Sequence, residues 1–210
     1  MQLEAYLERD DRIVLPLGST EQHAYLSLAT DAILAERVSV EAAEPLEVPV
    51  LPALAYGVTP YFAAFPGSPS LGSETYVSVL RELVSSLRGQ GFRRVLLVNG
   101  HGGNSFAAER LDAAWCDWWR APRVWEVVRA IDPEGTHASW MENFPWTRLA
   151  GVELPAEAKL AVERLADDPA AVRAELGDGS YGGPYAHSDE DMLRVWEAGV
   201  AAVRDAIDEL

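Results

Sequence analysis

Two short apolar runs, each followed by a glycine and a polar loop, constrain the fold of this chain more than any other feature. Arg12–Leu17 ends at Gly18, and Arg93–Val98 continues into Asn99-Gly-His-Gly-Gly-Asn104. Runs of this length and composition are typical of strands that are buried on both faces, as strands of parallel sheets are. The sequence therefore predicts two buried strands, each leading into a loop of polar residues.

Helical patterns alternate with these strands. Thr30 is expected as the N-cap of a helix that carries Asp31 in its first turn, and apolar spacing predicts a helix over Ser73–Arg88. A terminal helix is predicted over Ser188–Leu210, with Ser188 as its N-cap. Other helical segments are predicted over 105–119, 153–165 and 170–176.

The remaining segments are expected to be less regular. Glu47–Leu54 contains two prolines, which favour an edge strand or an extended loop, and residues 55–72 are expected to form an irregular loop. Val124–Val128 is predicted as a third strand. The alternation of strands and helices predicts an α/β fold, a three-layer sandwich with a mostly parallel central sheet, in one domain over residues 1–210.

Charge and cysteine content exclude several functions. The net charge of −16 disfavours nucleic acid and anionic membranes as partners, because both would be repelled. The single cysteine excludes an internal disulfide and any site built from several thiolates. No apolar stretch approaches the roughly 20 residues of a membrane span, and residues 1–12 are polar and acidic, so a cytoplasmic location is expected.

Metal-ligating side chains follow the two predicted strands. In parallel sheets, ligands bind beyond the carboxyl ends of the strands, and Glu21, His23 and His101 lie in the loops that begin there. Glu21 and His23 would project to the same side of an extended segment, and Asp31 could bridge two ions. Such a mixed nitrogen and oxygen set suits Zn²⁺, Mn²⁺ or Fe²⁺.

Two blocks of the sequence resemble a known family. The segments Leu15–His23 (with Thr30-Asp31 shortly after) and Val98–Asn104 resemble the two signature blocks of the creatininase (creatinine amidohydrolase) family. The resemblance implies a three-layer α/β fold, a binuclear metal centre with Zn or Mn, a small-molecule substrate and assembly as a homo-oligomer, a hexamer in many members.

The resemblance also implies roles for individual residues. Glu21, Asp31 and His101 would hold one ion, while His23, Asp31 and Glu142 would hold the other. A metal-bound hydroxide would attack the substrate, and His137 would protonate the leaving nitrogen. The expected substrate-binding residues are Gly102 and Gly103, through their backbone N–H groups, and Trp140 as a pocket wall.

The sequence departs from the family pattern in three places. Ser139 and Trp140 stand where the family has a glycine and its following residue after His-Ala. Asp31 comes eight positions after His23, against nine in the family. A Glu-His pair that many members carry before Phe-Pro-Gly is replaced by Tyr61 and Phe62, which predicts a more aromatic pocket. The sequence thus predicts an amidohydrolase that cleaves a C–N bond of a small cyclic amide or formamide-like substrate. The alternatives are a ring-opening hydrolase of a cyclic ketone or lactone, and a metal-binding or scaffold protein without turnover.

Several residues have a purely structural alternative. His137 could be a loop histidine satisfied by hydrogen bonds, and Glu142 could be a solvated surface carboxylate. His187 is expected to be a helix-entry residue, and Cys116 a small buried hydrophobic side chain. Packing in the core or at a subunit interface is expected for three tryptophans, Trp115, Trp118 and Trp119.

Overall fold

The sheet of this protein is parallel and short. The structure is a computed structural model that describes residues 2–162 and 164–210. Within them, β1 (Arg12–Leu17), β2 (Arg94–Asn99) and β3 (Ala114–Asp117) pair in the order β1-β2-β3, all parallel. Extended residues of 47–54 bridge the free edge of β1, Val50 opposite Val14 and Leu54 opposite Leu17. This agrees with the predicted edge strand or extended loop.

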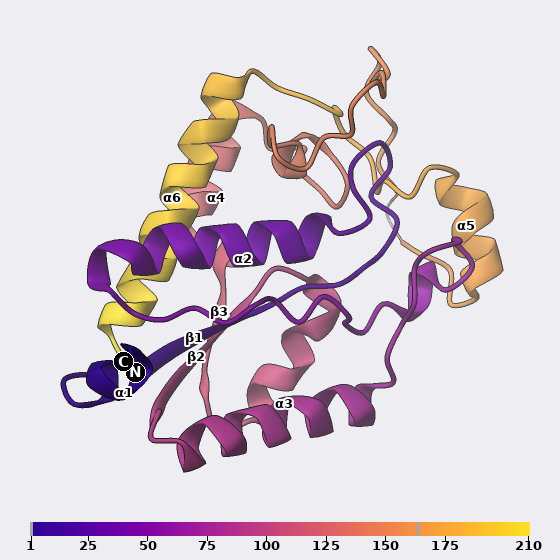
Figure 1. Cartoon of the computed structure of the whole chain (residues 1–210). Helices are drawn as coiled ribbons and strands as arrows, with labels where there is room; N and C mark the ends of the chain where they lie inside the picture. Colours follow the sequence, from indigo (N-terminus) through magenta and orange to yellow (C-terminus); the bar gives the residue numbers. More distant parts are fainter. Residues whose placement is uncertain (1, 163) are drawn as a thin grey trace.

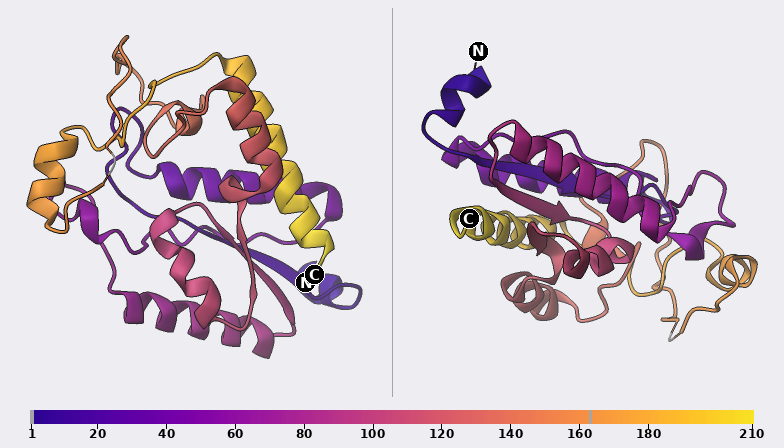
Figure 2. Two further views of the ribbon diagram at one scale, coloured as in Figure 1. Left: turned by 180° about the vertical axis from the view of Figure 1, so that it is seen from behind. Right: turned by 90° about the horizontal axis from the view of Figure 1, so that it is seen from below.

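Helices cover both faces of the sheet. Figure 2 shows α3 on one side of the strands and α4 with α6 on the other, and α2 packs against α6 (Figure 1). The α-helices are α1 (Gln2–Leu7), α2 (Thr30–Ala43), α3 (Ser73–Gly89), α4 (Pro122–Ile131), α5 (Pro169–Leu176) and α6 (Asp189–Asp208). Short 3₁₀ helices span Glu44–Leu46, Pro60–Phe62, Gly102–Arg110, Trp118–Arg120 and Trp140–Glu142. The predicted three-layer α/β fold with a parallel sheet is confirmed.

The core is divided by the sheet because neighbouring residues of a strand point to opposite faces. Ile13, Leu15 and Leu17 of β1 pack with α3, whereas Val14 packs with the cluster from α2, α4 and α6. All four side chains are almost fully buried. This arrangement explains why the strands are apolar without alternation, as the sequence indicated.

The predicted helix over 105–119 is wrong. The segment forms the 3₁₀ helix Gly102–Arg110 and then β3, which pairs with β2 through Leu97 opposite Trp115. Alanine-rich sequence favours a helix locally, but the free edge of β2 offers ladder hydrogen bonds and a buried face, and this tertiary pairing prevails.

The predicted third strand over Val124–Val128 is also wrong, since these residues lie in α4. Pro122 occupies the first turn, where its missing N–H is tolerated. Val124 and Val128, four residues apart, are the fully buried positions of the helix. The β-branched composition indicated a strand, whereas the spacing of the buried valines is helical.

No helix forms over 153–165 among its described residues; residue 163 lies outside them. Leu160 is 90% exposed, so the segment lacks the buried apolar face that would stabilise a helix. The predictions for α5 and α6 are confirmed, and the Ser188 side chain accepts a hydrogen bond from the Asp191 backbone N–H as an N-cap does. Thr30 is the first residue of α2 instead of its N-cap.

Every helix within residues 2–162 and 164–210 is too short or too polar to span a bilayer. The expectation of a single domain over 1–210 stays a prediction.

Candidate metal centre

Six titratable side chains converge beyond the carboxyl ends of β1 and β2. Four of them are buried, with exposed fractions of 1% for Glu21, 0% for His23, 2% for Asp31 and 7% for His101. The loop after β1 provides Glu21 and His23, the first turn of α2 provides Asp31, and the loop after β2 provides His101. The segment after α4 adds two more, His137 and Glu142. The structure thus brings together all the predicted metal ligands and the predicted proton-transfer residue.

Two glycines allow α2 to begin close to the sheet. A Cβ atom on Gly18, after β1, would lie 2.5 Å from the Ala32 backbone, and one on Gly100, after β2, would lie 2.7 Å from the Asp31 carbonyl oxygen. Both distances are shorter than any side chain tolerates. The glycines that close the two strands therefore let the first turn of α2 rest on the sheet edge, which places Asp31 between the two loops.

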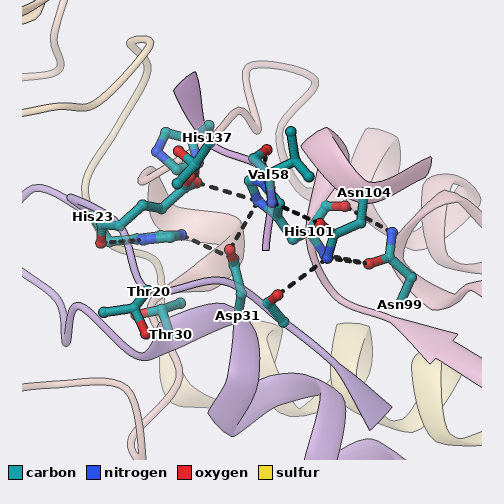
Figure 3. Close-up of polar contacts among 12 residues, drawn as sticks. Thr20, His23, Thr30, Asp31, Val58, Asn99, His101, Asn104 and His137 are labelled. Atoms are coloured by element: carbon teal, nitrogen blue, oxygen red, sulfur yellow. Dashed lines mark hydrogen bonds and ion pairs between the residues drawn. The ribbon is translucent and has the colours of Figure 1, made fainter. Parts of the chain in front are cut away.

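The carboxylate of Asp31 lies between two imidazoles (Figure 3). Its Oδ1 is 3.0 Å from Nε2 of His23, and its Oδ2 is 3.0 Å from Nδ1 of His101. Glu21 Oε1 lies 3.4 Å from the same His101 nitrogen, and Glu142 Oε2 lies 3.8 Å from the same His23 nitrogen. One carboxylate is thus shared between two sets of ligand atoms.

These atoms form two groups that fit a cation each. Glu21, Asp31 and His101, termed here the His101 group, have ligand atoms within 4.8 Å of one another, as do His23, Asp31 and Glu142, termed the Glu142 group. A third set combines Glu21, His23 and His137. Within each set the donors are oxygen and imidazole nitrogen, the combination that suits Zn²⁺ or Mn²⁺.

Unpartnered buried atoms support this fit. Glu21 Oε2, His23 Nε2 and Asp31 Oδ2 are buried and make no hydrogen bond of good geometry, although nitrogen and oxygen approach to 3.0 Å. Buried carboxylates without partners are costly unless they coordinate a metal. The lone pairs of the cluster therefore point at one another as those of a metal site do.

Backbone carbonyls fix the orientation of all three imidazoles. Nε2 of His101 donates to the Val58 carbonyl at 3.0 Å, and Nδ1 of His23 donates to the Glu21 carbonyl at 3.1 Å. Nε2 of His137 donates to the Gln22 carbonyl at 3.2 Å. Because one nitrogen of each ring donates to a carbonyl, the other faces the cluster and could ligate a cation once deprotonated, which is the usual second-shell arrangement around metal-ligating histidines.

The pKa values of the chain alone reflect the crowding of acids and imidazoles. Burial would lower the pKa of His23, but the carboxylates of Asp31, Glu142 and Glu21 outweigh it and raise this pKa to about 10. Burial raises the pKa of Glu142 to about 7, whereas burial and the neighbouring His23 lower the pKa of His137 to about 4. A cation would replace the protons that the carboxylates draw onto the imidazoles.

Two asparagines hold the His101 loop, and sequence reasoning assigned them no role. Asn99 clamps the His101 backbone, because its Oδ1 accepts from the His101 N–H at 3.1 Å and its Nδ2 donates to the His101 carbonyl at 2.7 Å. Asn104 donates to the Gly18 carbonyl and accepts from the Val58 N–H, both at 3.1 Å. Their position in the Val98–Asn104 block was the only signal that could have identified them.

The segment that carries His137 and Glu142 is supported differently. Ala138, between them, has a left-handed φ of 55°, and its N–H donates to Glu142 Oε2 at 2.6 Å. The His137 ring packs between Phe62 and Tyr181, with ring centroids 4.9 Å and 4.8 Å away. Glu142 is therefore neither a solvated surface carboxylate nor free to turn away.

A cavity of about 490 Å³ opens onto the cluster. Gly102 and Gly103 line it, and so do Tyr61 and Phe62, in agreement with the more aromatic pocket that the sequence predicted. Sequence reasoning missed part of the wall, which comprises Trp125, Tyr181 and Arg120, together with Trp118 and Trp119, which it had placed in the core or at an interface. Trp118 serves both purposes, since it is 4% exposed and also packs on Trp196.

Trp140 does not line this cavity, which corrects the expectation of a pocket wall. Its side chain is completely buried in the core cluster that includes α2, α4 and α6, with its ring edge-on to His187. The local 3₁₀ helix Trp140–Glu142 turns Glu142 toward the cluster and Trp140 away from it. His187 lies outside the cluster and pairs with Asp132 at 3.1 Å.

Comparison with known proteins agrees with this geometry. The family model described as creatinine amidohydrolase matches residues 1–207. The chain is 38% identical over 124 residues to the mycofactocin precursor peptide peptidase of Mycobacterium tuberculosis, which covers 50% of this chain and 49% of that protein. It is 33% identical over 109 residues to the creatinine amidohydrolase of Pseudomonas putida, with 49% and 42% covered.

A third relative has a different name. The chain is 30% identical over 103 residues to the 3-dehydro-scyllo-inosose hydrolase of Thermotoga maritima, which covers 48% of this chain and 33% of that protein. These matches span about half the length of the relatives or less.

Solved structures share the fold over the whole chain. A creatininase described as the Mn form superimposes with a TM-score of 0.79 at 23% identity, covering 100% of this chain and 96% of the other. A creatininase variant described as Zn-Zn type gives a TM-score of 0.76, also at 23% identity, with 100% and 95% covered. Because the family model matches residues 1–207 of this chain, the chain belongs to the creatininase family.

Proposed function

We propose that this chain is a metal-dependent amidohydrolase that binds two divalent cations, Zn and/or Mn with Fe as a further possibility. Its substrate would be a small cyclic amide or formamide-like molecule, cleaved at a C–N bond. The observation that carries the proposal is Asp31, whose two oxygens each lie 3.0 Å from a different imidazole. A carboxylate shared between two ligand sets can bridge two cations, as in a two-metal site.

The names of relatives support the reaction class. A creatinine amidohydrolase and a peptide peptidase both cleave a C–N bond next to a carbonyl carbon, and two solved creatininases are described as Mn and Zn-Zn forms. The cavity of about 490 Å³ is of the size that holds a small molecule. A small amide therefore fits the site better than an extended polymer.

The residues of the chain would divide the work as follows. The His101 group would hold one cation and the Glu142 group the other, and bound cations would supply Lewis acidity and lower the pKa of water in the site. His137 presents Nδ1 to the cluster while Nε2 donates to Gln22, so Nδ1 is the atom that would accept a proton and return it to the leaving nitrogen. Gly102 and Gly103 would allow the substrate carbonyl to approach the backbone.

A second candidate is a ring-opening hydrolase of a cyclic ketone or lactone. The similarity to a 3-dehydro-scyllo-inosose hydrolase favours it, because the same centre would polarise any carbonyl. A homo-oligomer, expected from the family resemblance, also remains a prediction.

Turnover after metal exchange tests the proposal. The protein is stripped with a chelator, reloaded with Zn²⁺ or Mn²⁺, and assayed on cyclic amides, formamides and lactones, with metal content measured by mass spectrometry. We expect about two ions per chain and activity that requires them. Anomalous scattering from crystals would place each ion against its ligands.

Two histidine variants provide the comparison. His101→Ala should lose metal and activity, whereas His187→Ala, which removes the one histidine outside the cluster, should keep both. A wild-type protein that takes up fewer than two ions at saturation, or hydrolysis that survives chelation, would contradict the binuclear mechanism.

A further inference from the structure

An arginine lines the cavity without a close partner for its charge. Arg120 is the only lysine or arginine among the described residues that line the cavity. Its nearest carboxylate oxygen, from Asp117, is 3.8 Å away, too far for a hydrogen bond, and its side chain is 53% exposed. The other oxygen of Asp117 is already occupied, because it accepts from Asn99 and Trp115. The guanidinium thus retains donors that a ligand could use.

The position of this guanidinium is set by an aromatic ring. Its carbon lies 4.4 Å from the centroid of the Trp119 ring, a cation–π contact. The same ring lies 3.8 Å from where a Cβ of Gly102 would stand, next to His101. Trp119 therefore lies between the loop of the metal centre and Arg120, and its ring forms part of the cavity wall.

The remainder of the wall is largely aromatic. Tyr61 and Phe62 come from the long loop after α2, Tyr181 from the loop after α5, and Trp125 from α4. Phe62 and Tyr181 are stacked at an interplanar angle of 9°. A planar apolar group would bury its surface against such walls, and stacking on the rings would add to the stabilisation from burial.

The charge inside the cavity is opposite to that of the chain as a whole. The centre contributes three carboxylates, from Glu21, Asp31 and Glu142, while two divalent cations would contribute four positive charges and Arg120 one more. The loaded cavity is then positive in a protein of net charge −16. Such a cavity favours an anionic ligand over a cationic one.

We propose that the substrate is an amide that carries a carboxylate beyond a flat apolar group, with Arg120 binding the carboxylate and the aromatic wall binding the flat group. This inference rests on the proposed function for the reaction but adds the substrate class. The carboxylate would take the two parallel N–H groups of the guanidinium, the geometry in which arginine discriminates best.

A binding experiment tests the arginine without turnover. The chelator-treated protein is titrated with para-toluate and its neutral isostere para-toluamide, followed by tryptophan fluorescence and calorimetry, so that carboxylate binding to a metal cannot contribute. Without cations the carboxylates of the centre disfavour an anion equally in every variant, so the comparison is made between variants. We expect the ratio of para-toluate affinity to para-toluamide affinity to be roughly five- to tenfold higher in the wild-type protein than in Arg120→Gln. Arg120→Lys should give an intermediate ratio, because lysine keeps the charge but lacks the two parallel N–H groups.

A matched arginine serves as the control. Arg123→Gln removes a side chain three residues away that pairs with Asp205 and does not line the cavity, so its affinity ratio should equal that of the wild-type protein. The same ratio in the wild-type protein and in Arg120→Gln, or the same fall in Arg123→Gln, would overturn the proposal.

Turnover separates this inference from the proposed function. Formate release is compared for three formamides, each with Zn²⁺ or Mn²⁺. The first is para-(formamidomethyl)benzoate, the second has a methyl group in place of its carboxylate, and the third is the formyl derivative of a linear ω-amino acid, which lacks the ring. The ring compound with the carboxylate should have the highest kcat/KM, and Arg120→Gln should lower it mainly through KM. Hydrolysis without preference for the carboxylate refutes the substrate class alone. Absence of hydrolysis combined with Arg120-dependent binding of para-toluate refutes the hydrolase and leaves the anion site.

Discussion

The His101 group and the Glu142 group share Asp31 but are supported by different parts of the molecule. In the His101 group every ligand follows a strand or begins a helix packed on the sheet, and the side chains of Glu21 and His101 are 2% and 9% exposed. In the Glu142 group one ligand comes from the irregular segment after α4, and the Glu142 side chain is 20% exposed. Regular secondary structure fixes all three ligands of the first group, whereas the position of Glu142 in the second group depends on the segment after α4.

This difference predicts that the two groups bind their cations with unequal affinity. Ligands fixed by secondary structure need little ordering when an ion binds, while a loop must be ordered at that moment. The His101 group should therefore bind its ion more tightly than the Glu142 group does. Four experiments test that comparison.

The largest effect should come from the ligand that the groups share. Asp31→Asn keeps the shape of the side chain but removes the charge that faces both imidazoles, so metal content should fall from about two ions per chain to nearly none and activity should be lost. Mass spectrometry of the dialysed protein measures the content. Retention of one tightly bound ion would show that the groups are independent.

Replacing the glutamate of one group at a time should show the affinity of each group separately. Glu142→Gln should leave one tightly held ion per chain, while Glu21→Gln should weaken the tighter site by at least about a hundredfold, since even second-shell losses cost 10–100-fold. Competition with a fluorescent chelator reports each affinity. If Glu21→Gln released only the weaker ion, the ranking of the groups would be reversed.

A glycine substitution should damage the His101 group selectively. A Cβ on Gly103 would lie 2.1 Å from the Val58 carbonyl oxygen and 2.5 Å from His101 Nε2, so Gly103→Ala must break the bond that orients this imidazole. We expect a loss of roughly 10–100-fold in affinity for that ion and of about 1–3 kcal/mol in the free energy of unfolding.

The neighbouring glycine provides the control for that variant. A Cβ on Gly102 would meet its nearest atom, in Trp119, at 3.8 Å, so Gly102→Ala should fold and bind metal almost normally. Calorimetric titration and urea unfolding of both variants measure the difference. Equal behaviour of the two would mean that the Val58 contact does not orient His101.

The smallest effect should come from the segment after α4, which carries Glu142. Ala138 has a φ of 55°, which costs an alanine roughly 1–2 kcal/mol and a glycine almost nothing. Ala138→Gly should raise the free energy of unfolding by up to about 1 kcal/mol. Ala201→Gly in α6, at a normal helical position, should lower it by about 1 kcal/mol. Thermal unfolding measures both, and destabilisation by Ala138→Gly would show that this turn is not strained.

Sequence reasoning anticipated the parts of the site that residue type reveals. Glu21, His23 and His101 follow apolar runs that are typical of buried strands. Because parallel strands end at the same edge of a sheet, the loops that carry these residues meet there. The orienting carbonyls of Val58 and Gln22 could not be foreseen, because any residue provides a backbone carbonyl and its direction depends on the folded loop.

The missed cavity wall has a related cause. Trp119, Arg120 and Trp125 lie after β3. In this part of the chain the sequence predicts a helix where β3 forms and a strand where α4 forms. Local propensity could not reveal that β2 had a free edge for this segment to pair with. With the wrong elements, the direction of these side chains toward the cavity was not predictable, even though their types were plain in the sequence.

The placement of Asp31 has a mechanical consequence. It stands at one end of α2, and Glu41 near the other end accepts a hydrogen bond from the Trp196 indole of α6 at 2.7 Å. Because both oxygens of this one carboxylate lie 3.0 Å from an imidazole, any displacement of the first turn of α2 would change both cation sites at once. The hydrogen bond to α6 thus anchors the helix on which both sites depend.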